Sequence, residues 1–163
     1  MKNLIWKMPL IIFTIFFCLW CIWHIFEINF YRSKIPPSIG ISYLPISIDV
    51  NDGILGGWGC VSFYMDKTSI KSIEKEGVEF LNKALSNQHK EREVKYTKWK
   101  ETPFPKETFS EGKSSRAVLH CNKGFDKELE TKVQKALQTK GSYYNDKIVV
   151  LPNLGIAIYR FFD

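Results

Sequence analysis

The sequence has few of the residues from which metal sites are built. Its 163 residues include 3 histidines and 4 cysteines, and beyond the first 30 residues these reduce to Cys60, His89, His120 and Cys121. Structural zinc sites use four nitrogen or sulfur ligands, usually as two closely spaced pairs. The chain has no such arrangement, so we expect no metal and no cofactor.

The same scarcity argues against catalysis. His120 and Cys121 are neighbours in a predicted strand, where adjacent side chains point to opposite faces and cannot form a nucleophile–base pair. Cys60 lies in an apolar stretch, where a thiolate is unfavourable. Asp49 and Asp52 flank a glycine-rich turn and are more typical of turn caps than of acid–base catalysts. We expect no enzyme, and an envelope hydrolase using Cys60, His120 or Asp52 is the least favoured alternative.

One long apolar run stands out against this background. Between Met8 and Phe26 the polar side chains are Thr14 and His24, and these nineteen residues span about 28 Å as a helix, close to the thickness of a bilayer core. A cleaved signal peptide would have a shorter run followed closely by small residues. The nearest small-x-small triplet instead lies behind Pro36. The run therefore predicts an uncleaved transmembrane helix that contacts the lipid bilayer through residues 8–30.

Two cysteines and a histidine inside this run invite a metal or redox interpretation. Cys18, Cys21 and His24 share roughly one helix face. A metal at membrane depth would require charged thiolates, a fourth ligand and supporting partners, none of which the sequence offers. We interpret these residues as packing or lipid-facing side chains.

Basic residues around the span predict its orientation. Lys2, Lys7 and the terminal amine precede it, whereas Arg32 and Lys34 follow it, which slightly favours an amino end in the cytoplasm. No asparagine begins an Asn-x-Ser/Thr glycosylation acceptor, which favours a bacterial protein over an exported eukaryotic one. We therefore expect a single-pass protein of the bacterial inner membrane with a periplasmic domain.

The two cysteines of the remaining chain fit an oxidising compartment. Cys60 and Cys121 are an even number of cysteines, and a single disulfide would leave neither of them free. Two buried free thiols are the alternative.

Periodicity divides the chain into three parts. Residues 1–31 are a cytoplasmic stub and the transmembrane helix, residues 32–40 are a proline-containing linker, and residues 41–163 are a soluble domain. Strands are predicted at 41–50, at a sheet edge because of Pro45, and at 58–65 in the sheet interior. The glycines at 53–59 lack the pattern of a phosphate-binding loop and indicate a turn.

Two helices and a terminal hairpin complete the predicted domain. A helix follows a cap at Asp66 or Thr68, and a second extends from Asp126 to Lys140. Apolar strands on both sides of residues 152–155 form a hairpin at the centre of the sheet. The predicted fold is α+β, with two helices packed on one face of a mostly antiparallel sheet.

A basic stretch with interleaved aromatic residues, followed by a proline-containing loop at 102–109, is the candidate partner surface. A solvated strand face would have the same pattern, and lipid or nucleic acid is a further alternative. Nucleic acid is not expected, because a periplasmic domain rarely meets it. The surface comprises Lys95, Tyr96, Lys98, Trp99, Lys100, Phe104 and Phe109.

These features predict a class of function rather than a particular activity. A small anchored domain without a catalytic constellation is typical of a protein-binding module, such as an immunity or inhibitor protein that neutralises a delivered acidic toxin. The alternative is a structural or accessory subunit of a cell-envelope complex.

Overall fold

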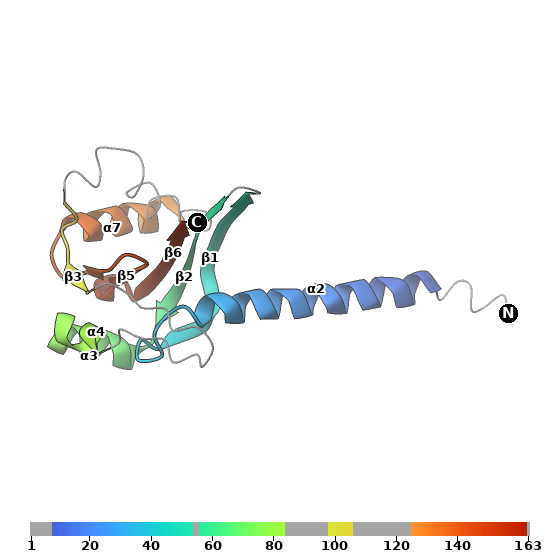
Figure 1. Ribbon diagram of the computed structural model, residues 1–163, viewed down its shortest axis with the longest axis horizontal. Coiled ribbons are helices and arrows are strands. Elements are labelled where there is room, and N and C mark those ends of the chain that lie inside the picture. The colour runs from blue at the N-terminus through green and yellow to red at the C-terminus, as the bar shows by residue number, and fades with distance from the viewer. Residues whose placement is uncertain (1–7, 54–55, 84–97, 106–124, 163) are drawn as a thin grey trace.

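The computed structural model describes residues 8–53, 56–83, 98–105 and 125–162, which form one long helix and an α+β domain (Figure 1). The helices are α2 (Met8–Arg32), α3 (Lys67–Glu76), α4 (Val78–Asn82) and α7 (Lys127–Gln138), with a 3-10 turn η1 (Pro152–Leu154). The strands are β1 (Ile41–Gly53), β2 (Gly56–Met65), β3 (Lys100–Glu101), β4 (Tyr143–Tyr144), β5 (Ile148–Leu151) and β6 (Ile156–Phe162).

The six strands form one sheet in the order β1-β2-β6-β5-β4-β3, with every neighbouring pair antiparallel. The predicted antiparallel sheet is confirmed, as are the edge position of the strand containing Pro45 and the interior position of β2. The register between β1 and β2 shifts on both sides of Pro45. Proline has no N–H for the ladder, so such an irregularity is tolerated best at an edge.

Apolar side chains cover both faces of the sheet, and the helices pack on opposite faces. Ile156 and Ile158 of β6 belong to a buried cluster with Val133 and Leu137 of α7. The alternate residues of the same strand lie in a second cluster with Ile73 of α3 and Leu81 of α4. Figure 1 shows α7 on one side of β5 and β6 and α3–α4 on the other.

This arrangement corrects the predicted placement of both helices on one face. Successive residues of a strand point to opposite sides. A strand that is apolar on both faces, such as β5 with all four residues buried, therefore needs cover on both sides. Helix α7 covers one face, and α3 together with α4 covers the other.

Helix caps lie where the sequence predicts them. The Asp66 carboxylate accepts a hydrogen bond from Ser69 N at 2.6 Å, and the Asp126 carboxylate accepts one from Leu129 N at 2.7 Å. The first predicted helix is interrupted at Gly77, whose φ of 57° lies in the region open to glycine, and continues as α4. The terminal hairpin is confirmed, with Gly155 at φ 64° ending η1.

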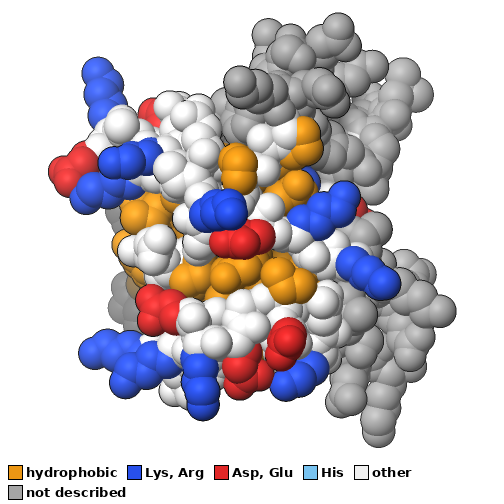
Figure 2. Space-filling model, turned by 90° about the vertical axis from the view of Figure 1, so that its left-hand side faces the viewer, with side chains coloured by type: hydrophobic (Ala, Val, Ile, Leu, Met, Phe, Trp, Pro, Cys, Tyr) orange, Lys and Arg blue, Asp and Glu red, His pale blue; other side chains and the backbone are white. Residues whose placement is uncertain are grey.

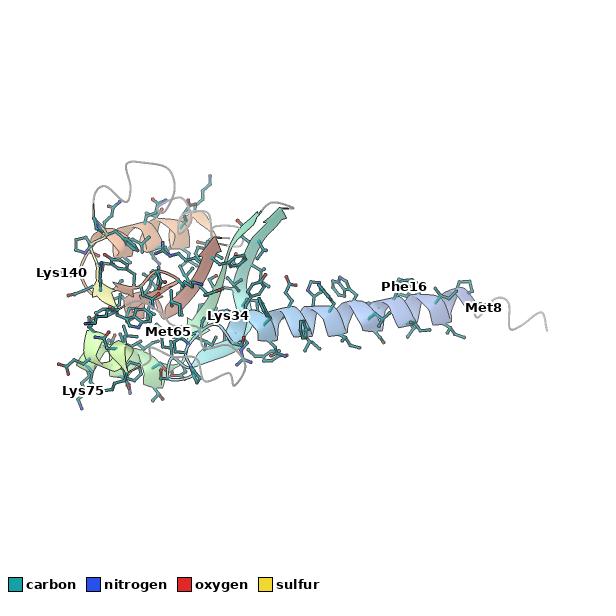
Figure 3. The ribbon with its side chains drawn as sticks, viewed as in Figure 1. Met8, Phe16, Lys34, Met65, Lys75 and Lys140 are labelled. Carbon is teal, nitrogen blue, oxygen red and sulfur yellow. The ribbon has the colours of Figure 1, made fainter. Side chains whose placement is uncertain are left out.

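Helix α2 projects from the domain with its apolar surface uncovered (Figures 1 and 3). It is long and apolar enough to cross a membrane, and none of its most apolar 18-residue window is buried. Its carboxyl end nevertheless joins the domain core, because Tyr31, Ile35 and Ile39 are buried there. Tyr31 stacks on Phe161 of β6, with ring centroids 6.1 Å apart. The segment after α2 is thus packed against the domain it connects.

Candidate functional site

The structure divides the candidate partner surface into exposed and buried residues. Lys98 and Lys100 are exposed, whereas Trp99 is only 3% and Phe104 only 7% exposed. Both aromatic side chains are therefore core residues, and the prediction that they belong to a contact surface is wrong. Lys95, Tyr96 and Phe109 lie outside the described residues.

Packing explains the burial of both rings. Trp99 lies in the cluster that includes Leu81 of α4, and its backbone N donates to Asn82 Oδ1 at 3.4 Å. Phe104 stacks on Tyr144 of β4, with centroids 4.0 Å apart. The alternation Lys98-Trp99-Lys100 was a usable signal, since it places the lysines on one side of the chain and the ring on the other.

Lys100 belongs to β3, which lies at the end of the domain away from α2 (Figure 1). We call this the distal face and define it by Lys100, Glu101, Pro103 and Tyr143, which come from β3, β4 and the segment after β3. Figure 2 shows hydrophobic side chains in a band on this face, flanked by basic and acidic ones. A surface of mixed charge with an apolar centre suits a protein partner better than a polyanion.

Hydrogen bonds hold the distal face in shape. Glu101 Oε1 accepts a hydrogen bond from Gly141 N at 3.1 Å, and Thr102 N donates to Ser142 O at 2.9 Å. Burial raises the pKa of Tyr143 above its usual value, and the Glu101 carboxylate raises it further.

A buried polar row was missed by sequence reasoning. Asp49, Cys60 and Arg160 pair across β1, β2 and β6 and are 4%, 1% and 7% exposed. They lie on the face covered by α7, since Cys60 belongs to the cluster of that helix. A single arginine within the apolar terminal strand was the signal that sequence reasoning did not use.

The contacts of Arg160 indicate a structural role. Its Nη2 donates to Asn145 O at 3.1 Å, and its guanidinium lies 5.9 Å from the Phe104 ring centroid. Within the described part of the chain, Nε and Nη1 have no hydrogen-bond partner. Burial lowers the pKa of Arg160, opposed by Asp146 and Tyr144. Because Asn145 also orders the turn before β5, Arg160 ties β6 to that turn.

The structure describes only some of the residues in the predicted disulfide and among the catalytic candidates. Cys60 is buried and is not one of the free cysteines, which are Cys18 and Cys21 among the described residues. Cys121 and His120 lie outside the described residues, and so does the side chain of Asp52. The Cys60–Cys121 bridge and the absence of an enzyme both stay predictions.

The residues described in the structure include no group of three or more histidines, cysteines or acids that could hold a metal ion. His24 Nδ1 instead lies 3.4 Å from Glu27 Oε2, and its ring meets Trp20 edge-on at 4.4 Å between centroids.

Comparison of the chain with protein-family models, with curated proteins and with solved structures gives no match.

Proposed function

We propose that this chain is a single-pass membrane protein whose α+β domain binds a protein partner. The uncovered surface of α2 is the observation that carries the proposal. Phe13, Phe16 and Trp23 are 69%, 68% and 66% exposed, although burial of each such side chain would contribute about 1.5–3 kcal/mol. A surface of this kind needs other apolar surroundings, and a bilayer supplies them along the whole helix.

The finer proposal concerns location. The basic flanks favour a cytoplasmic amino end, and a Cys60–Cys121 bridge would fit an oxidising compartment. We therefore place the domain in the bacterial periplasm, with α2 in the inner membrane.

The distal face supports the protein-binding part of the proposal. It faces away from α2, so a membrane-anchored domain presents it to the surrounding compartment. Residues 32–163 carry 21 Lys and Arg against 16 Asp and Glu, and this excess would attract an acidic partner. On these grounds we propose an immunity or inhibitor protein that captures a delivered toxin.

A second function is favoured by the polar pair on α2. His24 and Glu27 lie 3.4 Å apart near the end of the apolar run. Ionisable residues in a spanning helix commonly face another helix or a polar cavity. This observation supports an accessory subunit that is held in an envelope complex by its span.

One affinity experiment separates the two functions. Full-length protein is purified from envelope extracts either with residues 8–30 exchanged for an unrelated apolar helix or with Lys98→Glu and Lys100→Glu combined. For a binding module, the helix exchange retains the partner and the charge reversal loses it, while the control Lys71→Glu plus Lys75→Glu on α3 retains it. The opposite pattern, with the partner lost only on helix exchange, would establish the accessory subunit instead.

A further inference from the structure

A pocket of about 850 Å³ lies where α2 meets the domain. Its lining combines the last turns of α2, the segment that follows and the first residue of β1, including Phe26, Phe30, Arg32, Pro37 and Ile41. Figure 3 labels Lys34 at this junction. The volume lies within the roughly 300–1,000 Å³ typical of small-molecule sites.

The position along α2 places this pocket at the level of lipid headgroups. The apolar run ends at Phe26, and the polar residues Glu27, Asn29 and Arg32 follow in the next turns. At about 1.5 Å per residue, Arg32 lies about 9 Å beyond the apolar run. Tyr43 and Leu44 of β1 are exposed by 47% and 65%, which suits an edge strand that rests on the membrane interface.

Arg32 is the group best placed to recognise an anion there. Its guanidinium carbon lies 4.9 Å from the Tyr43 ring centroid, so the charged plane is held beside an aromatic face. Its Nε is buried and has no hydrogen-bond partner among the residues that the structure describes. A buried arginine N–H without a hydrogen-bond acceptor costs free energy unless a ligand supplies that acceptor. The planar guanidinium matches phosphate oxygens well.

Two basic side chains, Arg32 and Lys34, lie at the junction. Lys34 Nζ lies 4.3 Å from the Phe30 ring centroid and adds a second cation next to the pocket. Asp66 adjoins Gly40 of the lining, but its carboxylate accepts the Ser69 N–H as the cap of α3. Anionic lipids at a membrane surface attract such basic residues by about 1 kcal/mol each.

We propose that this junction pocket binds the phosphate-bearing headgroup of an anionic glycerophospholipid from the leaflet around α2. Arg32 contacts the phosphate, Lys34 adds long-range attraction, and Phe26, Phe30 and Pro37 accept the glycerol and the first acyl carbons. The bound headgroup would fix how close the domain lies to the membrane. The inference rests on the proposed membrane anchoring, because that anchoring places the pocket among headgroups.

The test uses full-length protein in a mild non-ionic detergent, titrated with dihexanoyl phosphatidylglycerol and monitored by ³¹P line broadening. We expect saturable binding that Arg32→Gln weakens by about tenfold, the loss of one charge-assisted contact. The exposed control Lys71→Gln should leave it unchanged. Asn29→Trp, which keeps every charge but occupies the pocket, should weaken binding as well.

Three results would overturn the proposal. These are equal binding by the Arg32→Gln protein, equal affinity for dihexanoyl phosphatidylcholine, and inorganic phosphate binding as tightly as the lipid, which would indicate a free-phosphate site. Unchanged circular dichroism of each variant excludes unfolding as the cause of lost binding. Failure of membrane anchoring is detected separately, by release of the protein from membranes at alkaline pH, which the titration in detergent does not measure.

Discussion

The backbone N–H of Gly40 donates a hydrogen bond of 2.8 Å to Ser69 Oγ and so joins the segment after α2 to the first turn of α3. Ser69 is 5% exposed, and its own N–H donates to Asp66 Oδ1. Asp66 N in turn donates to Gly40 O at 2.9 Å. Because the partly buried hydrogen bond from Gly40 to Ser69 joins residues 29 positions apart, this network fixes the end of the connecting segment on the domain.

Removing the Ser69 hydroxyl should loosen this connection. Ser69→Ala leaves the Gly40 N–H without its acceptor, and the free energy of unfolding should fall by about 1–2 kcal/mol. Urea unfolding of full-length protein in detergent measures the change. Ser72→Ala on the same helix is the matched control and should cost less than about 0.5 kcal/mol. Equal losses for the two variants would contradict the proposed role of the hydrogen bond.

A methyl group at Gly40 should clash with the carboxylate of Asp66. A Cβ there would lie 1.7 Å from Asp66 Oδ2, so Gly40→Ala should cost about 1–3 kcal/mol. A double-mutant cycle with Asp66→Ala isolates the clash, since the second change removes the carboxylate. We expect a coupling energy of about 1 kcal/mol or more from urea unfolding. Simple additivity of the two losses would mean that Gly40 is required for another reason.

The raised pKa of Tyr143 predicts a loss of stability at alkaline pH. The usual tyrosine pKa is 10.0, and burial followed by the Glu101 charge raises it in the folded protein. Above pH 10 the unfolded chain releases the phenolic proton while the folded protein retains it. The stability contributed by this group is therefore complete below pH 10 and is lost as the pH rises through the folded pKa.

Substitution of Tyr143 should reduce that dependence. The free energy of unfolding of the Tyr143→Phe protein should decrease less between pH 9 and pH 11 than that of the wild type. Parallel slopes for wild type and Tyr143→Phe would show that another group causes the alkaline loss.

Thiol chemistry tests the predicted bridge and the location together. Cys18 and Cys21 are replaced by alanine, so that a membrane-impermeant maleimide can report only Cys60 and Cys121. In intact cells whose outer membrane has been made permeable, we expect labelling only after reduction and unfolding, as for a periplasmic disulfide. Free thiols that stay shielded until the inner membrane is broken would place the domain in the cytoplasm.

Local rules explain why much of the fold was predictable. Asp66 and Asp126 cap helices because a short acceptor before an amphipathic run satisfies free N–H groups, and both caps occur. Pro45 indicated an edge strand because it cannot donate to a ladder. The candidate surface was less predictable. Whether Trp99 faces solvent or the core depends on α4, which contacts it through the fold rather than through sequence proximity.

The sequence by itself determined the apolar helix, the helix caps and the terminal hairpin, because each depends on residues that are close together in the chain. Tertiary structure alone decided that α7 and α3–α4 cover opposite faces, and that Asp49, Cys60 and Arg160 share one buried row. It also formed the junction pocket around Arg32. The opposite faces and the buried row depend on strand order and register, which bring together residues as far apart in the sequence as Cys60 and Arg160. The pocket depends instead on how residues 26–41 fold where α2 meets the domain.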